Sequence, residues 1–419
     1  FLPAELQTDN YQQYPGEWIN KAISLLNSSE RPVIVAGNGI RLAKGIPEFL
    51  ALVEHLQIPV LTTWLGMDLI HEQHELFVGR PGSIAPRGAN FALQNSDLLL
   101  SIGARLDMAM VGYAYQNLAR GAKKIIVDID LSEIKKINTS IDLPIVSDAK
   151  VFIDHLMKNE ARIDKKNRSA WITRCRDWKE KYPVVIKEFH QKDGPLSMYA
   201  FSEILADQLS EQDIIAPGSS GNALETFLLV FKTKPGQRIF HARGLGAMGF
   251  GLPASIGACI GSGGKRTICV DGDGGFQMNI QELETVARLN LPIKFFVINN
   301  NGFASIRAMQ NNYFKQLTAS DATSGLTLPD VVKLASVYNI HAIRISAYDN
   351  IREQINQVLA FDGPVVCEVV VLPDEVRAPR LSSKKLADGS MVSSPLEDLW
   401  PFLDREEFNS NMLIPPISE

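Results

Sequence analysis

Two short apolar runs in the second half of the chain are each followed by residues that could bind a metal ion. Asp271-Gly272-Asp273-Gly274-Gly275 comes directly after the run 267–270, and Asn299-Asn300-Asn301-Gly302 comes directly after the run 293–298. Both runs are typical of buried parallel strands, and a helical pattern lies between them. Because ligands bind beyond the carboxyl ends of parallel strands, we expect both polar loops at one edge of a sheet.

These residue types suit a magnesium-bridged diphosphate. Mg²⁺ takes oxygen ligands and shares them among one or two carboxylates, waters and substrate phosphates. Asp273 would supply the charge, the Asn300 amide oxygen a neutral ligand and the Gly302 carbonyl a third. Three glycines would let backbone N–H groups approach phosphate oxygens at the start of the next helix; they are Gly272, Gly274 and Gly275.

Two other interpretations of the Asp273 loop are a plain turn and an EF-hand. An EF-hand loop from Asp271 to Glu282 would have acids at its first, third and last positions. However, Phe276 stands where an EF-hand needs glycine, and a strand rather than a helix precedes the loop. The residues therefore favour the diphosphate interpretation.

Length and composition limit the class of protein. A chain of 419 residues exceeds the usual single core, so two or three domains are expected. A hydrophobic content of 45%, a charged content of 21% and a net charge of -5 describe a soluble protein and argue against nucleic acid as a partner. The four cysteines show no metal-binding spacing, which indicates reduced thiols of the cytoplasm. The uncharged stretch Gly244–Gly261 contains Pro253 and several glycines, which favour a buried helix over a membrane span.

Alternating strand and helix patterns predict an α/β fold of two doubly wound parallel-sheet domains joined by a helical connector. No ordered element is expected before Pro32, because the first residues lack an initiator Met and resemble a linker between domains. The expected parts are a linker (1–30), a middle Rossmann-like domain (31–160), a connector (161–195), a diphosphate- and magnesium-binding domain (196–372) and a C-terminal tail (373–419).

The elements of these domains can be placed by their periodicity. Strands are expected at 33–36, 60–63, 98–102, 124–129, 214–216, 238–240, 267–270, 293–298, 341–345 and 365–371. Helices are expected at 46–56, 88–94 and 149–158. Gly37-Asn38-Gly39 follows the first strand and suggests dinucleotide binding, but Leu42 replaces the third glycine of that fingerprint. A tight turn between strand and helix is the alternative.

Several of these motifs together resemble the acetolactate synthase-like branch of the thiamine diphosphate (ThDP) enzymes. In the second domain they are HARGLGAMGFGLPASIGA (241–258), VDGDGGFQMNIQELETVARLNLPI (270–293) and the Asn run. In the first domain they include RPVIVAGNG (31–39) and GARLD (103–107). The likeness covers residues from about 30 to 375 and implies a middle domain followed by the diphosphate-binding domain.

The resemblance implies ThDP and Mg²⁺ as cofactors and assigns four further residues. Met248 would prop the cofactor in its bent form, and the Gly246 carbonyl would accept a hydrogen bond from the cofactor's amino group. Ser219 and Ser220 match a position that touches the diphosphate.

The family's catalytic glutamate belongs to a separate pyrimidine-binding domain, usually from the partner subunit. No such domain is found in this sequence, so no catalytic residue is assigned within it. The chain is expected to be a fragment of a longer enzyme and inactive alone. Three glutamates of the diphosphate-binding domain are not expected to take over the role; they are Glu225, Glu282 and Glu284.

The implied reaction decarboxylates a 2-oxo acid, with pyruvate as the expected substrate, and transfers the two-carbon unit to a carbonyl acceptor. Met309 stands where acetolactate synthases carry a Trp that shapes the acceptor pocket. Arg307 and Gln310 are candidates for binding substrate oxygens, and a solvated helix face is the alternative. Transfer to a keto-sugar, a simple 2-oxo acid decarboxylase and a non-catalytic ThDP-binding chain remain open.

FAD is a further cofactor that the resemblance allows. Gly103-Ala104-Arg105 fits part of the family's flavin site, whereas Met108-Ala109 replaces the acid and the arginine expected after Asp107. The resemblance also implies a homodimer or homotetramer.

Overall fold

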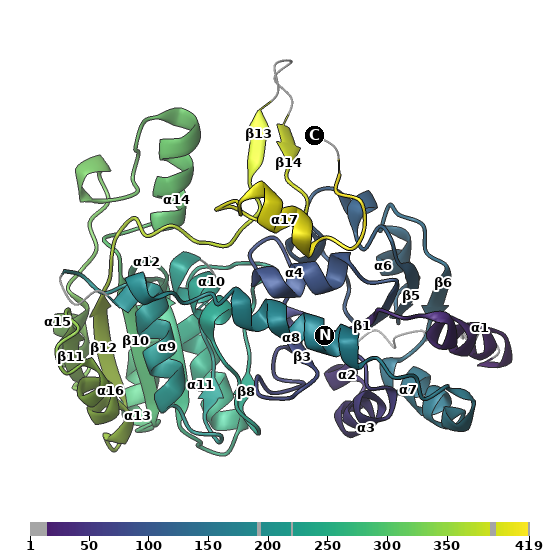
Figure 1. The fold of residues 1–419 in the computed structure, drawn as a ribbon. Helices are drawn as coiled ribbons and strands as arrows, with labels where there is room; N and C mark the ends of the chain where they lie inside the picture. Colours follow the sequence, from purple (N-terminus) through teal and green to yellow (C-terminus); the bar gives the residue numbers. More distant parts are fainter. Residues whose placement is uncertain (1–14, 191–193, 219–220, 386–390, 418–419) are drawn as a thin grey trace. The chain divides into compact units, whose positions relative to one another are not determined.

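Figure 1 shows the fold in a computed structural model, which describes residues 15–190, 194–218, 221–385 and 391–417. The chain forms two compact units: unit 1 takes the chain up to Pro183 and again from Ala378 on, and unit 2 comprises Val184–Arg377. Each unit has a six-stranded sheet in which every neighbouring pair is parallel. The predicted α/β fold of two doubly wound parallel-sheet domains is confirmed.

Unit 1 has the strand order β3-β2-β1-β4-β5-β6. Its strands are β1 (Pro32–Ala36), β2 (Val60–Thr62), β3 (Phe77–Gly79), β4 (Leu98–Ile102), β5 (Lys123–Asp128), β6 (Leu143–Val146), β13 (Ser383–Lys385) and β14 (Met391–Ser393). Its helices are α1 (Pro15–Ser28), α2 (Gly39–Leu42), α3 (Ile46–Leu56), α4 (Arg87–Gln94), α5 (Met108–Val111), α6 (Leu131–Lys135), α7 (Ala149–Met157), α8 (Ser169–Lys181) and α17 (Arg405–Asn411).

Both faces of the unit 1 sheet are buried because successive side chains of a strand point to opposite faces. Ile34 packs in a core cluster with Phe49 of α3 and Phe152 of α7. Val33 lies in another cluster, which includes Trp178 of α8. Continuous apolar strands such as β1, PVIVA, are therefore covered by helices on both sides.

The expectation that no ordered element precedes Pro32 is wrong. Helix α1 buries Trp18, Ile19 and Ala22 in the same cluster as Ile34. These residues recur at helical spacing, and their burial makes α1 part of unit 1.

Most of the expected connector and tail belongs to unit 1; the connector from Val184 on and the tail up to Arg377 belong to unit 2. Trp171 and Trp178 of α8 are buried, and the Trp171 Nε1–H donates to the Pro32 carbonyl at 2.9 Å. The tail forms the hairpin β13–β14 and helix α17, drawn in yellow in Figure 1. Asn95 at the end of α4 donates to the Asn411 carbonyl at 3.0 Å, so α17 is fixed to α4.

Unit 2 has the strand order β11-β12-β10-β9-β7-β8. Its strands are β7 (Ile214–Ile215), β8 (Arg238–Ile239), β9 (Thr267–Gly272), β10 (Ile293–Asn299), β11 (His341–Ile345) and β12 (Val365–Val370). Its helices are α9 (Met198–Gln208), α10 (Gly221–Val230), α11 (Gly251–Gly261), α12 (Asp273–Phe276), α13 (Leu283–Arg288), α14 (Ala304–Met309), α15 (Val331–Val337) and α16 (Ile351–Ala360).

Strand β10 lies inside the unit 2 sheet, with β9 and β12 as its neighbours. Phe295 and Val297 face a core cluster that includes Leu283 of α13. Phe296 faces the other side, where its ring lies 5.8 Å from that of Phe201 of α9. The chain reverses its winding between β7 and β9, which is where open parallel sheets bind ligands.

The ten predicted strands and three predicted helices are present, with ends shifted by at most two residues. The short strands β3 and β6 and the hairpin were not predicted. Within the described residues, no helix is both long and apolar enough to cross a membrane.

Candidate cofactor and metal site

The structure brings Asp273 and the Asn run together at the carboxyl edge of unit 2. Strands β9 and β10 are in register there, with Gly272 opposite Ile298. The Asp273 Oδ2 accepts hydrogen bonds from the backbone N–H groups of Asn300, at 3.2 Å, and Gly302, at 3.0 Å. Its Oδ1 accepts from the Gly274 N–H at 2.7 Å. The carboxylate of one loop thus organises the backbone of the other.

Asp273 and Asn300 are both 5% exposed. Burial raises the pKa of Asp273 to about 6, although the three N–H donors and the charge of Arg307 act to lower it. The Asn300 Oδ1 is buried and has no hydrogen-bond partner. Buried acceptors nearly always have a partner, so this orphaned oxygen needs one from outside the chain.

A cation fits this pair of groups. Mg²⁺ prefers carboxylate and amide oxygens and completes its octahedron with phosphates and waters. No group of three His, Cys, Asp or Glu residues within the described ranges is arranged to hold a metal ion. A carboxylate and an amide oxygen leave other positions of a Mg²⁺ octahedron to phosphates and waters, which agrees with the diphosphate interpretation.

Asn299 and Asn301 differ from Asn300 in their surroundings. The Asn299 Nδ2 donates to Glu368 at 2.7 Å, and its Oδ1 accepts from the Asn301 N–H at 3.0 Å. Asn301 has a φ of +60°, and Gly302 a φ of +118°. A Cβ at Gly302 would lie 2.4 Å from the Ser320 carbonyl oxygen. The Asn299 side chain is therefore occupied, and the Asn301 side chain is exposed, whereas Asn300 has a buried oxygen left for a ligand.

Asp271 was not singled out by sequence, yet it explains part of the glycine pattern. It is 4% exposed, and burial raises its pKa to about 7. A Cβ at Gly218, Gly251 or Gly275 would come within 2.0, 2.4 or 2.8 Å of its carboxylate. Gly275 thus accommodates the Asp271 side chain. In the sequence, the only indication of this role was an acidic residue two positions before Asp273.

The remaining glycines of the loop differ in role. A Cβ at Gly274 would lie 2.2 Å from the Phe303 ring, so Gly274 permits close packing between the two loops. At Gly272 the nearest such contact is 4.0 Å, and there the backbone stays open. Gly272 is therefore the glycine whose absent side chain leaves room for a ligand.

Gly246 and Met248 lie in the turn before α11. The Gly246 N–H donates to the Ala242 carbonyl at 3.0 Å, and Gly246 has a φ of +62°. Met248 is half-buried, and the next carbonyl, of Gly249, accepts from Asn279 Nδ2 at 2.7 Å. The turn is thus held by neighbouring segments of unit 2. Ser219 and Ser220 lie outside the described residues.

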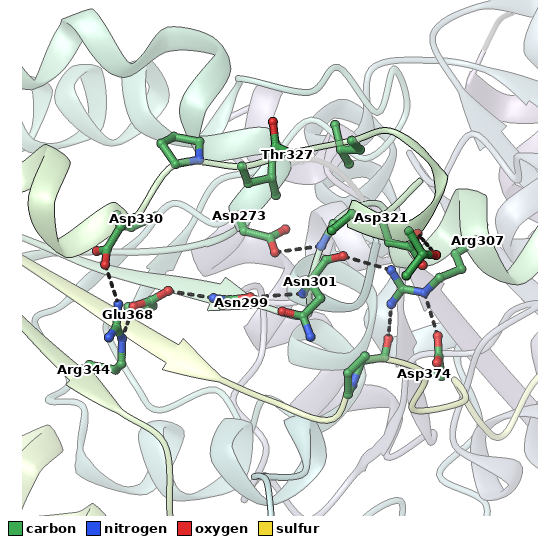
Figure 2. Close-up of a pocket in the computed structure, with 18 residues that line it drawn as sticks. Asp273, Asn299, Asn301, Arg307, Asp321, Thr327, Asp330, Arg344, Glu368 and Asp374 are labelled. Carbon is green, nitrogen blue, oxygen red and sulfur yellow. Dashed lines mark hydrogen bonds and ion pairs between the residues drawn. The ribbon is translucent and has the colours of Figure 1, made fainter. Parts of the chain in front are cut away.

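Figure 2 shows residues that line a cavity beside the turn Asn300–Gly302, here called the metal-ligand turn after its candidate ligands. The cavity has a volume of about 680 Å³, and charged side chains from several segments of unit 2 line it. Arg307 lines it and is 3% exposed. Met309 is 49% exposed, and the Gln310 side chain bonds both backbone groups of Thr318, at 2.9 and 3.1 Å. The proposed substrate roles of these three residues stay predictions.

Comparison with known proteins gives two family matches. Residues 19–156 match the model described as "Thiamine pyrophosphate enzyme, central domain". Residues 219–369 match "Thiamine pyrophosphate enzyme, C-terminal TPP binding domain". Asp273, Asn300 and Gly302 lie within the second match.

Among curated relatives, the probable acetolactate synthase large subunit of Methanococcus aeolicus is 34% identical over 85% of this chain and 60% of its own length. The large subunit of Cyanidium caldarium is 32% identical over 88% of this chain and 62% of its own length. The acetolactate synthase large subunit of Corynebacterium glutamicum is 31% identical over 93% of this chain and 62% of its own length. The chain thus spans about 60% of the length of these relatives.

Proposed function

The chain belongs to the thiamine pyrophosphate enzymes, and from this we propose that it forms the diphosphate- and magnesium-binding part of an acetolactate synthase-like carboligase. The proposed enzyme decarboxylates a 2-oxo acid, with pyruvate as the expected substrate, and transfers the two-carbon unit to a carbonyl acceptor. The observation that supports this most directly is the unpartnered Asn300 Oδ1 beside the buried Asp273 carboxylate.

In this proposal the chain's own residues bind and orient. Asp273 and the Asn300 amide oxygen hold Mg²⁺, and the Gly302 carbonyl is the third protein ligand. The open backbone at Gly272 lets the diphosphate approach. Bound ThDP supplies the electron sink that carbon–carbon cleavage needs, a reaction that side chains alone do not perform. Met248 supports the cofactor from the turn before α11, and the Gly246 carbonyl accepts a hydrogen bond from it.

The catalytic glutamate is proposed to lie outside these 419 residues. Glu225 forms ion pairs with Arg243, at 3.5 Å, and with Arg377. These ion pairs engage its carboxylate, whereas the family's glutamate acts through a hydrogen bond to the pyrimidine ring. Glu282 bonds Thr285 at 3.3 Å on the surface of its helix. The partner subunit of a homodimer or homotetramer is the proposed source of the glutamate.

The dinucleotide interpretation of Gly37-Asn38-Gly39 is less well supported than the tight-turn interpretation. The Gly37 N–H donates to Ile102 at 2.9 Å, and the Gly39 N–H donates to Gly103 at 3.0 Å. A Cβ at Gly37 would lie 2.1 Å from the Gly103 carbonyl oxygen, so these glycines permit the contact between two loops. The amides that a diphosphate would need are therefore already used, and the tight-turn interpretation explains them. FAD binding at Gly103-Ala104-Arg105 stays a prediction, which the ultraviolet-visible absorbance of the purified protein tests.

The proposal is tested by calorimetric titration of the chain with ThDP, once at a fixed Mg²⁺ concentration and once with a chelator in place of Mg²⁺. We expect saturable binding that depends on Mg²⁺. Absence of binding under both conditions would overturn the diphosphate assignment.

The reaction itself is tested separately, by feeding pyruvate to the chain alone and to the chain joined to a pyrimidine-binding domain of a relative. We expect turnover only in the second case. An acetolactate product supports the carboligase, free aldehyde supports the decarboxylase, and tight ThDP binding without turnover supports a non-catalytic chain. Met309 in place of the acceptor-site Trp favours including keto-sugars among the acceptors tested.

A further inference from the structure

Arg307 is a buried arginine whose guanidinium faces the metal-ligand turn. It projects from α14 and is 3% exposed. Its Nη2 donates to the Asn300 carbonyl at 3.0 Å, and its Nη1 donates to the Asn301 carbonyl at 3.2 Å. Both of these carbonyls belong to the turn that presents the Asn300 side chain. Figure 2 shows Arg307 at this end of the cavity.

The same guanidinium holds the turn to two other segments. Its Nη2 also donates to the Pro373 carbonyl at 2.7 Å, and its Nε pairs with Asp374 at 2.7 Å. The Ser320 carbonyl accepts from the Phe303 N–H at 2.9 Å and lies 3.5 Å from the Arg307 Nη1. Arg307 therefore links the metal-ligand turn to the chain after β12 and to the loop around Ser320.

A buried charge is costly unless its donors are satisfied. Here backbone carbonyls accept from both terminal nitrogens, and the planar fork of the guanidinium offers five donors in a fixed geometry, whereas an ammonium group offers three from a single atom. These bonds hold the backbone of the metal-ligand turn rather than leaving the guanidinium free in the cavity. Metal sites depend on such outer contacts for ligand orientation.

We propose that Arg307 is a positioning residue, which holds Asn300–Gly302 in the geometry that binds Mg²⁺. This goes beyond the substrate-binding role predicted from the sequence, and it rests on the proposed function. It requires that loss of Arg307 weaken metal binding although Arg307 itself touches no metal.

The test compares Arg307→Met and Arg307→Lys by Mg²⁺ titration of ThDP binding. For Arg307→Met we expect the Mg²⁺ concentration at half-saturation to rise by about 10–100-fold. Arg307→Lys should restore part of this loss, since it keeps the charge but not the fork. Arg352→Met is the control, because Arg352 is a 59% exposed arginine of unit 2 that pairs with Asp207. It should leave the titration unchanged.

A second measurement separates this inference from the proposed function. Backbone hydrogen exchange of residues 298–303 in the metal-free chain should be faster in Arg307→Met than in wild type, while exchange in β9 and β12 stays the same. If wild type binds no ThDP, the proposed function fails and the exchange result alone decides the role of Arg307. An unchanged Mg²⁺ titration or unchanged exchange in a folded Arg307→Met variant would overturn the inference.

Discussion

Asn299 donates a hydrogen bond from its Nδ2 to the buried Glu368 carboxylate at 2.7 Å and so joins the ends of β10 and β12. Glu368 is 3% exposed and also accepts from the Arg344 Nε. On its other side, Asn299 accepts from the Asn301 N–H. Asn299 therefore connects strand β12 to the turn through two hydrogen bonds, a role called the brace below, and Asn300 is the candidate ligand.

Replacing this brace by an acid should disrupt the turn. Asn299→Asp would place two carboxylates side by side and remove the donor to Glu368. We expect a loss of about 2–4 kcal/mol in the free energy of unfolding at neutral pH, because the buried Glu368 carboxylate loses one donor and faces a second negative charge, although Arg344 still pairs with it. Chemical denaturation measures this loss. Asn312→Asp adds the same charge at an exposed position and should cost almost nothing; equal effects of the two variants would contradict the bracing role.

Removing the charge of Asp273 should strongly weaken metal binding. Asp273→Asn keeps the size of the side chain but loses the carboxylate that Mg²⁺ requires. We expect Mg²⁺-dependent ThDP affinity to fall by about 100-fold or more, since even outer contacts are worth 10–100-fold. The melting temperature of the metal-free chain should also fall, because the amide nitrogen of Asn cannot accept the backbone N–H bonds that the replaced carboxylate oxygen accepts. Full retention of the Mg²⁺ dependence would exclude Asp273 as a ligand.

Gly302 is expected to tolerate no side chain. Gly302→Ala combines a φ of +118° with a Cβ 2.4 Å from the Ser320 carbonyl, so the turn must move. We expect a loss of roughly 2 kcal/mol or more and weaker Mg²⁺ binding. The control is Gly264→Ala, with a φ of +82° and no atom within 4 Å of the added Cβ. It should cost only about 1–2 kcal/mol and leave Mg²⁺ binding intact. Similar Mg²⁺ affinities of the two variants would show that the contact between the added Cβ and the Ser320 carbonyl does not displace the turn.

Lys294 should make the stability of unit 2 depend on alkaline pH. It is 1% exposed in β10, donates to the Phe361 and Gly363 carbonyls, and burial lowers its pKa to about 8. Between about pH 8 and 10.5 the unfolded chain binds this proton and the folded chain does not, so wild type gains stability as the pH rises.

The variant Lys294→Met isolates this effect. Measured by denaturation at several pH values, the stability of wild type relative to Lys294→Met should rise by up to about 3 kcal/mol across this range. Subtraction of the variant removes the other groups that titrate there. A difference that stays constant with pH would show that the folded protein keeps Lys294 charged.

The sequence was sufficient to predict the long apolar strands and the pairing of Asp273 with Asn300. Strands such as β9 and β10 are continuous apolar runs of six and seven residues followed by polar loops. Because the carboxyl ends of parallel strands lie at one edge of a sheet, their polar loops are expected close together. The three-residue strand β3 and the four-residue strand β6 are too short for a periodic signal. Helix α1 was missed because its apolar spacing lies in a segment whose composition resembles a linker.

The finer roles at the site depend on contacts that are remote in sequence. Asn299 and Asn300 are neighbours of the same type, and only Glu368 distinguishes the brace from the ligand. Gly275 is explained by Asp271 rather than by a phosphate. Arg307 has the pattern of a surface helix residue, and its burial follows from Ser320 and Pro373, which no local pattern connects to it.

Unit 1 is assembled from two stretches of chain that are separated by the whole of unit 2. The stretch from Ala378 on accepts hydrogen bonds from buried donors of the stretch before Pro183. Asn90 Nδ2 donates to the Leu396 carbonyl at 2.6 Å, and Trp178 Nε1 donates to Asn411 Oδ1 at 2.8 Å. During synthesis the ribosome releases these acceptors only after unit 2 has emerged. Unit 2 is a continuous segment that can complete its folding first, whereas unit 1 has to wait for the last part of the chain to be translated.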